Sequence, residues 1–169
     1  MSLKVIHSKN LRWVDVINPQ EPEIDFLKKN FQLHPLIYQD ILLPSQHTKI
    51  ETLGDYTLIV LIFPVYNRKT REIVPGEVDF IIGQDYLITI HDGAMYTLVK
   101  TVNNVHAQED ARREYMGKNA GYLLYQVLES LFKRSFPILD HINKDMTDIE
   151  KNIFNDMSLG MLEQISLMK

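Results

Sequence analysis

Cysteine is absent from this 169-residue chain. The absence excludes disulfide bonds, zinc–thiolate sites and thiol nucleophiles, and it is typical of proteins from reducing compartments. The longest apolar run, YTLIVLIFPVY at residues 56–66, contains a proline and is shorter than the ~20 residues that a membrane-spanning helix needs. The N-terminus also lacks the apolar segment of a signal peptide. As given, the chain is therefore expected to be soluble.

Clusters of positive charge are missing too. The net charge is −4, and no run of basic residues is longer than Arg112-Arg113. Because nucleic-acid binding needs a concentrated basic surface, we expect no nucleic acid as a partner.

Enzyme motifs are not found in the sequence either. There is no nucleophile elbow, phosphate loop or glycine-rich nucleotide fingerprint, and no two of the six histidines have the spacing of a zinc-binding helix. His91-Asp92 is the nearest approach to a catalytic pair, but adjacent residues of a strand point to opposite faces. The sequence therefore predicts a protein without enzymatic activity.

The first two thirds of the chain alternate between strand-like and helix-like segments. Apolar and β-branched runs predict strands at 11–18, 56–66, 77–82 and 86–91, and their near-continuous hydrophobicity favours a sheet covered on both faces. Asn18-Pro19 predicts a helix start, a second helix begins at Pro35 and stops at Pro44, and a third spans 94–108. Residues 67–76 are expected to form a turn, and residues 108–119 a polar connector or a poorly packed helical turn.

The last third predicts one long helix over residues 120–155, with Pro137 kinking or dividing it. Such a helix would span ~54 Å. A second amphipathic helix begins near residue 161 and is unfinished at Lys169, so the chain is expected to be part of a longer protein. Acidic residues form a stripe along the second half of this helix and just beyond it: Asp140, Asp145, Asp148, Glu150 and Asp156. We interpret the stripe as a solvated face or, alternatively, as a source of negative potential that concentrates cations.

Asp40 is the most unusual residue of the second helix. On a helix that starts at Pro35, apolar residues surround most of the circumference, and Asp40 falls between Leu36 and Ile37. Its carboxylate is therefore expected in a crowded, partly dry place, where it needs a positive partner, hydrogen-bond donors or a metal ion.

Five segments together resemble a known family. WVDVINP, FQLHPLIYQDIL, QHTKIETLGDYTLIVL, YLITIHD and YLLYQVLESL are similar, in this order, to the cytoplasmic domain of CorA-type magnesium transporters. The resemblance implies an α/β fold with a mixed, largely antiparallel sheet flanked by helices (an α/β/α sandwich), followed by a long acidic helical hairpin. Residues 1–118 would form the α/β domain, and residues 119–169 the long helix and the start of a second helix leading toward a stalk.

The family's function would then apply to the full-length protein. The resemblance implies a homopentameric channel in the cell inner membrane, with this part on the cytoplasmic side and the membrane reached only through helices beyond residue 169. Mg²⁺ would be the regulatory ion and the transported substrate, with Co²⁺ or Ni²⁺ as further ions. The ion would hold subunits together without any bond being made or broken. A zinc or other divalent-cation transporter of the same superfamily and a soluble protein-interaction module are the alternatives.

The resemblance also implies metal contacts. Asp40 matches the family's aspartate that faces an acidic residue of the neighbouring subunit across Mg²⁺, and Glu129 matches an acidic residue on the YLLY helix. Gln39 stands where the family usually has glutamate, so a second ion site is weakened or lost. The alternative for Asp40 is a salt bridge to a lysine or arginine of its own chain, and for Glu129 a place on a solvated helix face.

Overall fold

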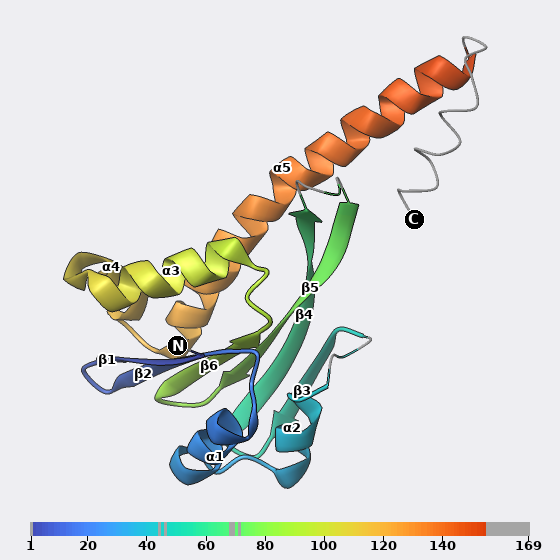
Figure 1. The fold of residues 1–169 in the computed structure, drawn as a ribbon. Helices are drawn as coiled ribbons and strands as arrows, with labels where there is room; N and C mark the ends of the chain where they lie inside the picture. The colour runs from blue at the N-terminus through green and yellow to red at the C-terminus, as the bar shows by residue number, and fades with distance from the viewer. Residues whose placement is uncertain (1, 44, 46, 68–69, 71, 155–169) are drawn as a thin grey trace.

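In the computed structural model of the protein, which describes residues 2–43, 45, 47–67, 70 and 72–154, six strands form one sheet (Figure 1). Their order across the sheet is β1-β2-β6-β5-β4-β3. The strands are β1 Leu3–Ser8, β2 Leu11–Ile17, β3 Lys49–Leu53, β4 Tyr56–Asn67, β5 Glu72–Ile82 and β6 Tyr86–His91.

The sheet is mixed and largely antiparallel, as the sequence predicted. Only the β2–β6 pair is parallel among the described strands. Two helices and three strands separate β2 from β6 in the chain, and β6 then lies beside β2 in the same direction. The other neighbours are antiparallel. Between β3 and β4, Gly54 has a positive φ of 60° that glycine adopts without steric cost.

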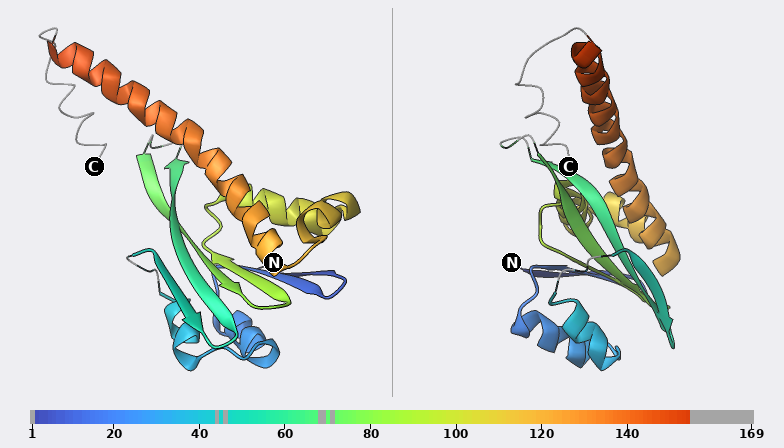
Figure 2. Two further views of the ribbon diagram at one scale, coloured as in Figure 1. Left: turned by 180° about the vertical axis from the view of Figure 1, so that it is seen from behind. Right: turned by 90° about the vertical axis from the view of Figure 1, so that its right-hand side faces the viewer.

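Helices cover both faces of the sheet, which confirms the layered architecture (Figure 2). α1 Glu21–Asn30 and α2 Pro35–Asp40 cover one face, and α3 Tyr96–Ala107, α4 Glu109–Met116 and α5 Ala120–Phe154 cover the other. Successive strand residues alternate between the two cores, so Trp13 packs beneath α3–α5 while Val14 packs beneath α1 and α2.

Several expected boundaries are wrong. The first helix begins at Glu21 rather than at Pro19. Asn18 does not cap it, because Asn18 has a positive φ of 50° and its side-chain amide donates to the Asp92 carbonyl at 3.0 Å. The Glu23 carboxylate instead accepts from the Gln20 backbone N–H at 3.0 Å, which satisfies a free donor at the helix start.

Other segments carry more regular structure than expected. β1 and β3 are edge strands that the sequence did not predict, and β4 and β5 extend into the segment interpreted as a turn, as far as Asn67 and from Glu72. The expected connector contains the helix α4, whose Ala111 and Met116 are buried in the core. α2 ends at Asp40, before the expected stop at Pro44, which lies outside the described residues.

The long helix α5 is continuous through Pro137, so the predicted division at this proline is wrong (Figures 1 and 2). Pro137 and Lys133 are both exposed, and the proline cannot donate the helical hydrogen bond to the Lys133 carbonyl. Leu123, Val127 and Leu131 are fully buried against the sheet, whereas Met146 is half exposed where α5 has passed the sheet.

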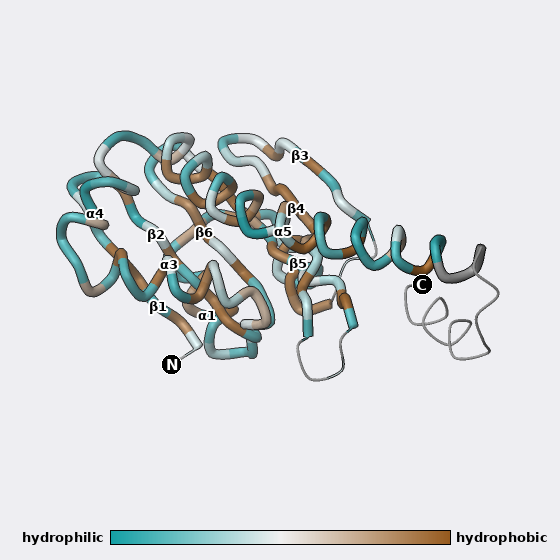
Figure 3. Tube along the Cα trace, turned by 90° about the horizontal axis from the view of Figure 1, so that it is seen from above, coloured by the Kyte–Doolittle hydropathy of each residue, from teal (hydrophilic) through white to brown (hydrophobic). Residues whose placement is uncertain are grey.

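Figure 3 shows hydrophilic and hydrophobic residues alternating along this outer part of α5. The second arm of the predicted hairpin, with Asp156 of the acidic stripe, lies outside the described residues.

Candidate functional site: the corner at the end of α2

Asp40 is the last residue of α2 and lies at the surface. His34 caps this helix, its Nδ1 accepting from the Leu36 backbone N–H at 3.3 Å, and Ile37 and Tyr38 are buried against the sheet. Asp40 points the other way, and 49% of its side chain is exposed. The expectation of a crowded, partly dry carboxylate is therefore wrong, because the helix is only six residues long and has an open side.

Lys49 at the start of β3 is the partner of Asp40. Its Nζ lies 3.1 Å from Asp40 Oδ2 and 3.5 Å from Glu51 Oε1, so one ammonium serves two carboxylates. The hydrogen bond to Asp40 is the main cause that raises the pKa of Lys49, against the opposing effect of its partial burial. An ion pair within one chain, the alternative left open by the sequence, is what the structure contains.

A second acidic pair lies on β5, on the same face of the sheet. Asp79 stands between Val60 of β4 and Ile90 of β6 in the strand register and is only 6% exposed. Its Oδ1 is buried without a hydrogen-bond partner. Burial, with the charge of Glu77 as a second cause, raises the pKa of Asp79 to about 7. Glu77 itself accepts from the Ser45 backbone N–H at 2.7 Å.

The chemistry of this corner suits a hydrated, hard cation. Mg²⁺ prefers carboxylate oxygens, keeps most of its water ligands and needs only one or two acidic side chains. The exposed carboxylate of Asp40 meets that need. In the described part of the chain, however, no group of three or more histidine, aspartate or glutamate side chains is arranged to hold a metal ion. The described residues of one chain therefore offer at most part of a coordination sphere here.

The other expected metal contacts lie apart or carry no charge. Glu129 belongs to α5 on the opposite face of the sheet from α2, and it bonds Lys133 at 3.2 Å and the Tyr125 hydroxyl at 3.3 Å. Asp40 and Glu129 of one chain are therefore not brought together. Gln39 is exposed next to Asp40, and its backbone carbonyl accepts from the Leu42 backbone N–H at 3.2 Å.

A buried polar network lies elsewhere in the sheet and was not found from the sequence. His91 pairs with Asp15 at 3.2 Å, not with the adjacent Asp92, and the Thr89 hydroxyl donates to the same Asp15 oxygen at 2.6 Å. The alternation in Trp13-Val14-Asp15 was the available signal, because it places the indole and the carboxylate on one face. These groups connect the parallel strands β2 and β6 and lie beneath α3–α5, so they are not part of the α2 corner.

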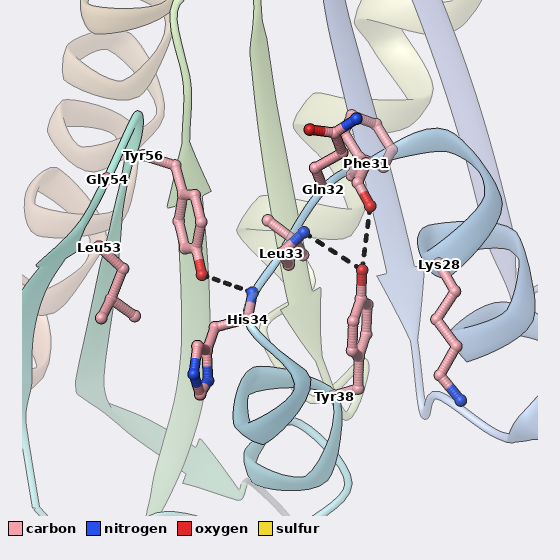
Figure 4. Close-up of a pocket in the computed structure, with 9 residues that line it drawn as sticks. All are labelled: Lys28, Phe31, Gln32, Leu33, His34, Tyr38, Leu53, Gly54 and Tyr56. Atoms are coloured by element: carbon pink, nitrogen blue, oxygen red, sulfur yellow. Dashed lines mark hydrogen bonds between the residues drawn. The ribbon is translucent and has the colours of Figure 1, made fainter.

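An open hollow of about 690 Å³ lies beside α2 (Figure 4). Its main polar groups are already used to hold the segment between α1 and α2. The Tyr56 hydroxyl accepts from His34 N at 2.8 Å, and the Tyr38 hydroxyl bonds the backbone of Phe31 and Leu33. The hydrogen bonds of these lining residues therefore hold the start of α2, the helix that ends in Asp40.

Comparison with known proteins identifies the family. Residues 8–169 match the family described as CorA-like Mg2+ transporter protein. The chain belongs to this family. The cobalt/magnesium transport protein CorA of Thermotoga maritima is 26% identical over 125 residues, which cover 73% of this chain and 34% of that protein. The magnesium transporter ALR1 of Saccharomyces cerevisiae is 25% identical over 158 residues, covering 90% of this chain and 18% of that protein. The chain spans less than half the length of these CorA-like relatives.

Solved structures share the CorA-like fold. The soluble domain of CorA from Methanocaldococcus jannaschii superposes with a TM-score of 0.69 at 21% identity, covering 92% of this chain and 60% of that one. The ZntB cytoplasmic domain from Vibrio parahaemolyticus has a TM-score of 0.67 at 14% identity, covering 95% of this chain and 62% of that one. Among the helices that the structure describes, none combines the length and the apolar character that a membrane crossing requires.

Proposed function

We propose that this chain is the regulatory, Mg²⁺-sensing part of a CorA-like divalent-cation transporter, and that Asp40 contacts a hydrated ion at a boundary between subunits. The family match over residues 8–169 carries the transporter assignment. The carboxylate of Asp40 supports the site, because half of its side chain stays exposed beside Lys49 and the described residues offer no complete set of metal ligands around it.

The surroundings of Asp40 support a contact with another protein surface. Leu36 lies one helical turn before Asp40, Leu42 and Leu43 lie two and three residues after it, and all three of these large apolar side chains are exposed. Exposed apolar groups around a charged centre are typical of a surface that a partner covers. A neighbouring subunit that supplies the missing oxygen ligands would bury these leucines at the same time.

In this proposal the ion controls packing and no bond is made or broken. With the ion in place, acidic groups of two subunits share one divalent charge. Without it they repel each other, and the contact loosens. The full-length protein would be a homopentamer in the inner membrane, with this domain on the cytoplasmic side. Mg²⁺ would be both regulator and cargo, and Co²⁺ or Ni²⁺ would be further ions.

Glu129 has less support as a metal ligand. Its carboxylate is bound by Lys133 and Tyr125 of its own helix, so an ion would have to displace both partners. A zinc transporter is the second candidate function, since the ZntB cytoplasmic domain has the same fold. The division into residues 1–118 and 119–169 stays a prediction, and the start of α5 packs in the same core as the sheet.

Limited proteolysis of the full-length protein tests the proposal. Millimolar MgCl₂ is expected to slow cleavage in the wild type and to have no effect on the Asp40→Ala variant. Asp25→Ala is the matched control, because Asp25 is an exposed carboxylate on α1, on the same face of the sheet. A magnesium response that persists in Asp40→Ala contradicts the role of Asp40. Protection by ZnCl₂ at much lower concentration than MgCl₂ favours the zinc alternative.

A further inference from the structure

Lys49 lies between one carboxylate at the surface and another in the interior. In the strand register Lys49 of β3 is opposite Val60 of β4, which is opposite Asp79 of β5, so all three side chains share the face covered by α1 and α2. Asp40 approaches the lysine from α2, on the outer side. Strands are spaced ~4.8 Å apart, so the flexible four-carbon stem of lysine can reach across the single strand between it and Asp79.

The carboxylates of Asp40 and Asp79 differ in their bonding partners. Asp40 holds the lysine at 3.1 Å, whereas the buried Oδ1 of Asp79 has no hydrogen-bond partner. A buried carboxylate without a partner is costly, and the charge of Lys49 already acts favourably on Asp79. Asp79 therefore offers a second position for the ammonium group, and it gains more from the contact than a solvated acid would.

We propose that Lys49 is a built-in counter-ion that occupies Asp40 in the absence of a divalent cation and moves to Asp79 when the cation displaces it. This inference rests on the proposed function, because it takes Asp40 as the residue that contacts the ion. A divalent cation at Asp40 repels the ammonium group, and Asp79 receives it on the inner side of the sheet face. Asp40 and Asp79 are then both paired in the ion-bound state, Asp40 with the cation and Asp79 with Lys49.

The exchange makes the lysine a determinant of ion affinity. The cation must replace an existing ion pair at Asp40, so Lys49 raises the concentration of ion that is needed. Asp79 lowers that concentration, because it stabilises the displaced lysine, although it does not contact the ion itself. Glu51, 3.5 Å from Nζ, is the competing destination at the surface.

Amine labelling of the full-length protein tests where the lysine goes. Lys49 is acetylated at a pH above the pKa of Asp79, with and without MgCl₂, and peptide mass spectrometry gives its rate relative to the exposed Lys29 of α1. MgCl₂ is expected to lower the rate of Lys49 several-fold in the wild type and in Glu51→Gln. In Asp79→Asn the rate is expected to rise or stay constant, because the inner position is lost.

The outcomes separate this inference from the proposed function. A rate that rises in the wild type, or that falls equally in Asp79→Asn, overturns the exchange, since the lysine is then released to solvent or merely covered by a neighbouring subunit. If magnesium still protects the wild type from protease when one of these two labelling results is found, the proposed function is kept and only the exchange of Lys49 is rejected. If magnesium changes neither protease cleavage nor labelling, both fail together.

A double-mutant cycle gives an independent readout. Lys49→Met is expected to shift the magnesium midpoint of protease protection to a lower concentration by up to about five-fold, the range of an exposed ion pair. Asp79→Asn is expected to raise the midpoint in the wild-type background and to leave it unchanged in Lys49→Met. An equal effect of Asp79→Asn in both backgrounds means that Asp79 acts only through its long-range field, and the exchange is then wrong.

Discussion

The imidazole of His91 lies 3.2 Å from the Asp15 carboxylate in the interior of the sheet. Its other nitrogen, Nδ1, accepts a hydrogen bond from the Gly93 backbone N–H at 3.0 Å, so Nε2 carries the hydrogen and donates to Asp15. The Thr89 hydroxyl donates to the same oxygen and accepts from the Trp13 indole at 3.1 Å. These bonds join β2 to β6 at the only parallel pair of the described sheet.

Thr89→Val tests the contribution of this network to stability. The substitution keeps the shape but leaves the Trp13 N–H without an acceptor and removes the shortest bond to Asp15. Because each buried group without a partner costs about 1–3 kcal/mol, the free energy of unfolding is expected to fall by roughly 2–4 kcal/mol in urea denaturation. Thr52→Val is the control, since Thr52 is exposed on β3, and a change within about 0.5 kcal/mol is expected there. Equal effects of the two substitutions would show that the network adds nothing.

The sequence predicted the interior of this fold better than its edges and its polar contacts. The strands around Leu58, Ile81 and Ile88 are buried on both faces, and their continuous apolar character identified them. β3 was missed because, at the sheet edge, it exposes Ile50, Glu51 and Thr52 and shows no alternation.

The polar contacts depend on residues far apart in the chain. Asp15 and His91 are 76 positions apart, and Asp79 and Lys49 come onto one face only through the order of the strands, so no local pattern predicts either arrangement. Asp40 was singled out as an unusual residue but was placed in the wrong environment. Its exposure is decided by where α2 ends, and helix ends are poorly determined by periodicity.

Asp79 is expected to make stability fall as the pH rises. Its pKa is about 7 in the folded protein against an ordinary value of 3.8, so the folded state binds more protons than the unfolded state between these values. The contribution of Asp79 to the free energy of unfolding is therefore largest below about pH 4 and decreases as the pH rises through 7. The total decrease is at most about 4 kcal/mol. The charged groups that act on Asp79 are Glu77, Lys49 and Asp40.

Asp79→Asn isolates this effect. The variant is expected to match the wild type near pH 4 and to be more stable above pH 7, in urea titrations across this range. Asp25→Asn, an exposed change on α1, serves as the control and is expected to follow the wild-type pH profile. If Asp79→Asn loses stability with pH in parallel with the wild type, Asp79 is already ionised in the folded protein at low pH.

Pro137→Ala is expected to stabilise the outer part of α5 locally. Proline has no N–H to bond the Lys133 carbonyl, and a proline inside a helix costs up to about 3 kcal/mol. Amide hydrogen exchange over residues 138–151 is therefore expected to slow, while the exchange of the buried strands stays unchanged because none of the residues 138–151 belongs to the buried core. Arg134→Ala, an exposed change in the same helix, controls for helix propensity alone. Unchanged exchange in Pro137→Ala would mean that the proline does not limit this helix.

Asp40 is expected to contribute almost nothing to folding, which separates a regulatory residue from a structural one. Its ion pair with Lys49 is half exposed and contributes about 0–1 kcal/mol, and a negative charge at the end of α2 is unfavourable to the helix dipole. Asp40→Asn is therefore expected to unfold within about 1 kcal/mol of the wild type while the full-length variant loses its magnesium response. Asp85→Asn breaks a similarly exposed pair with Arg12 and is expected to keep both properties. A loss of more than about 2 kcal/mol in Asp40→Asn would instead assign Asp40 a structural role, since surface changes rarely cost so much.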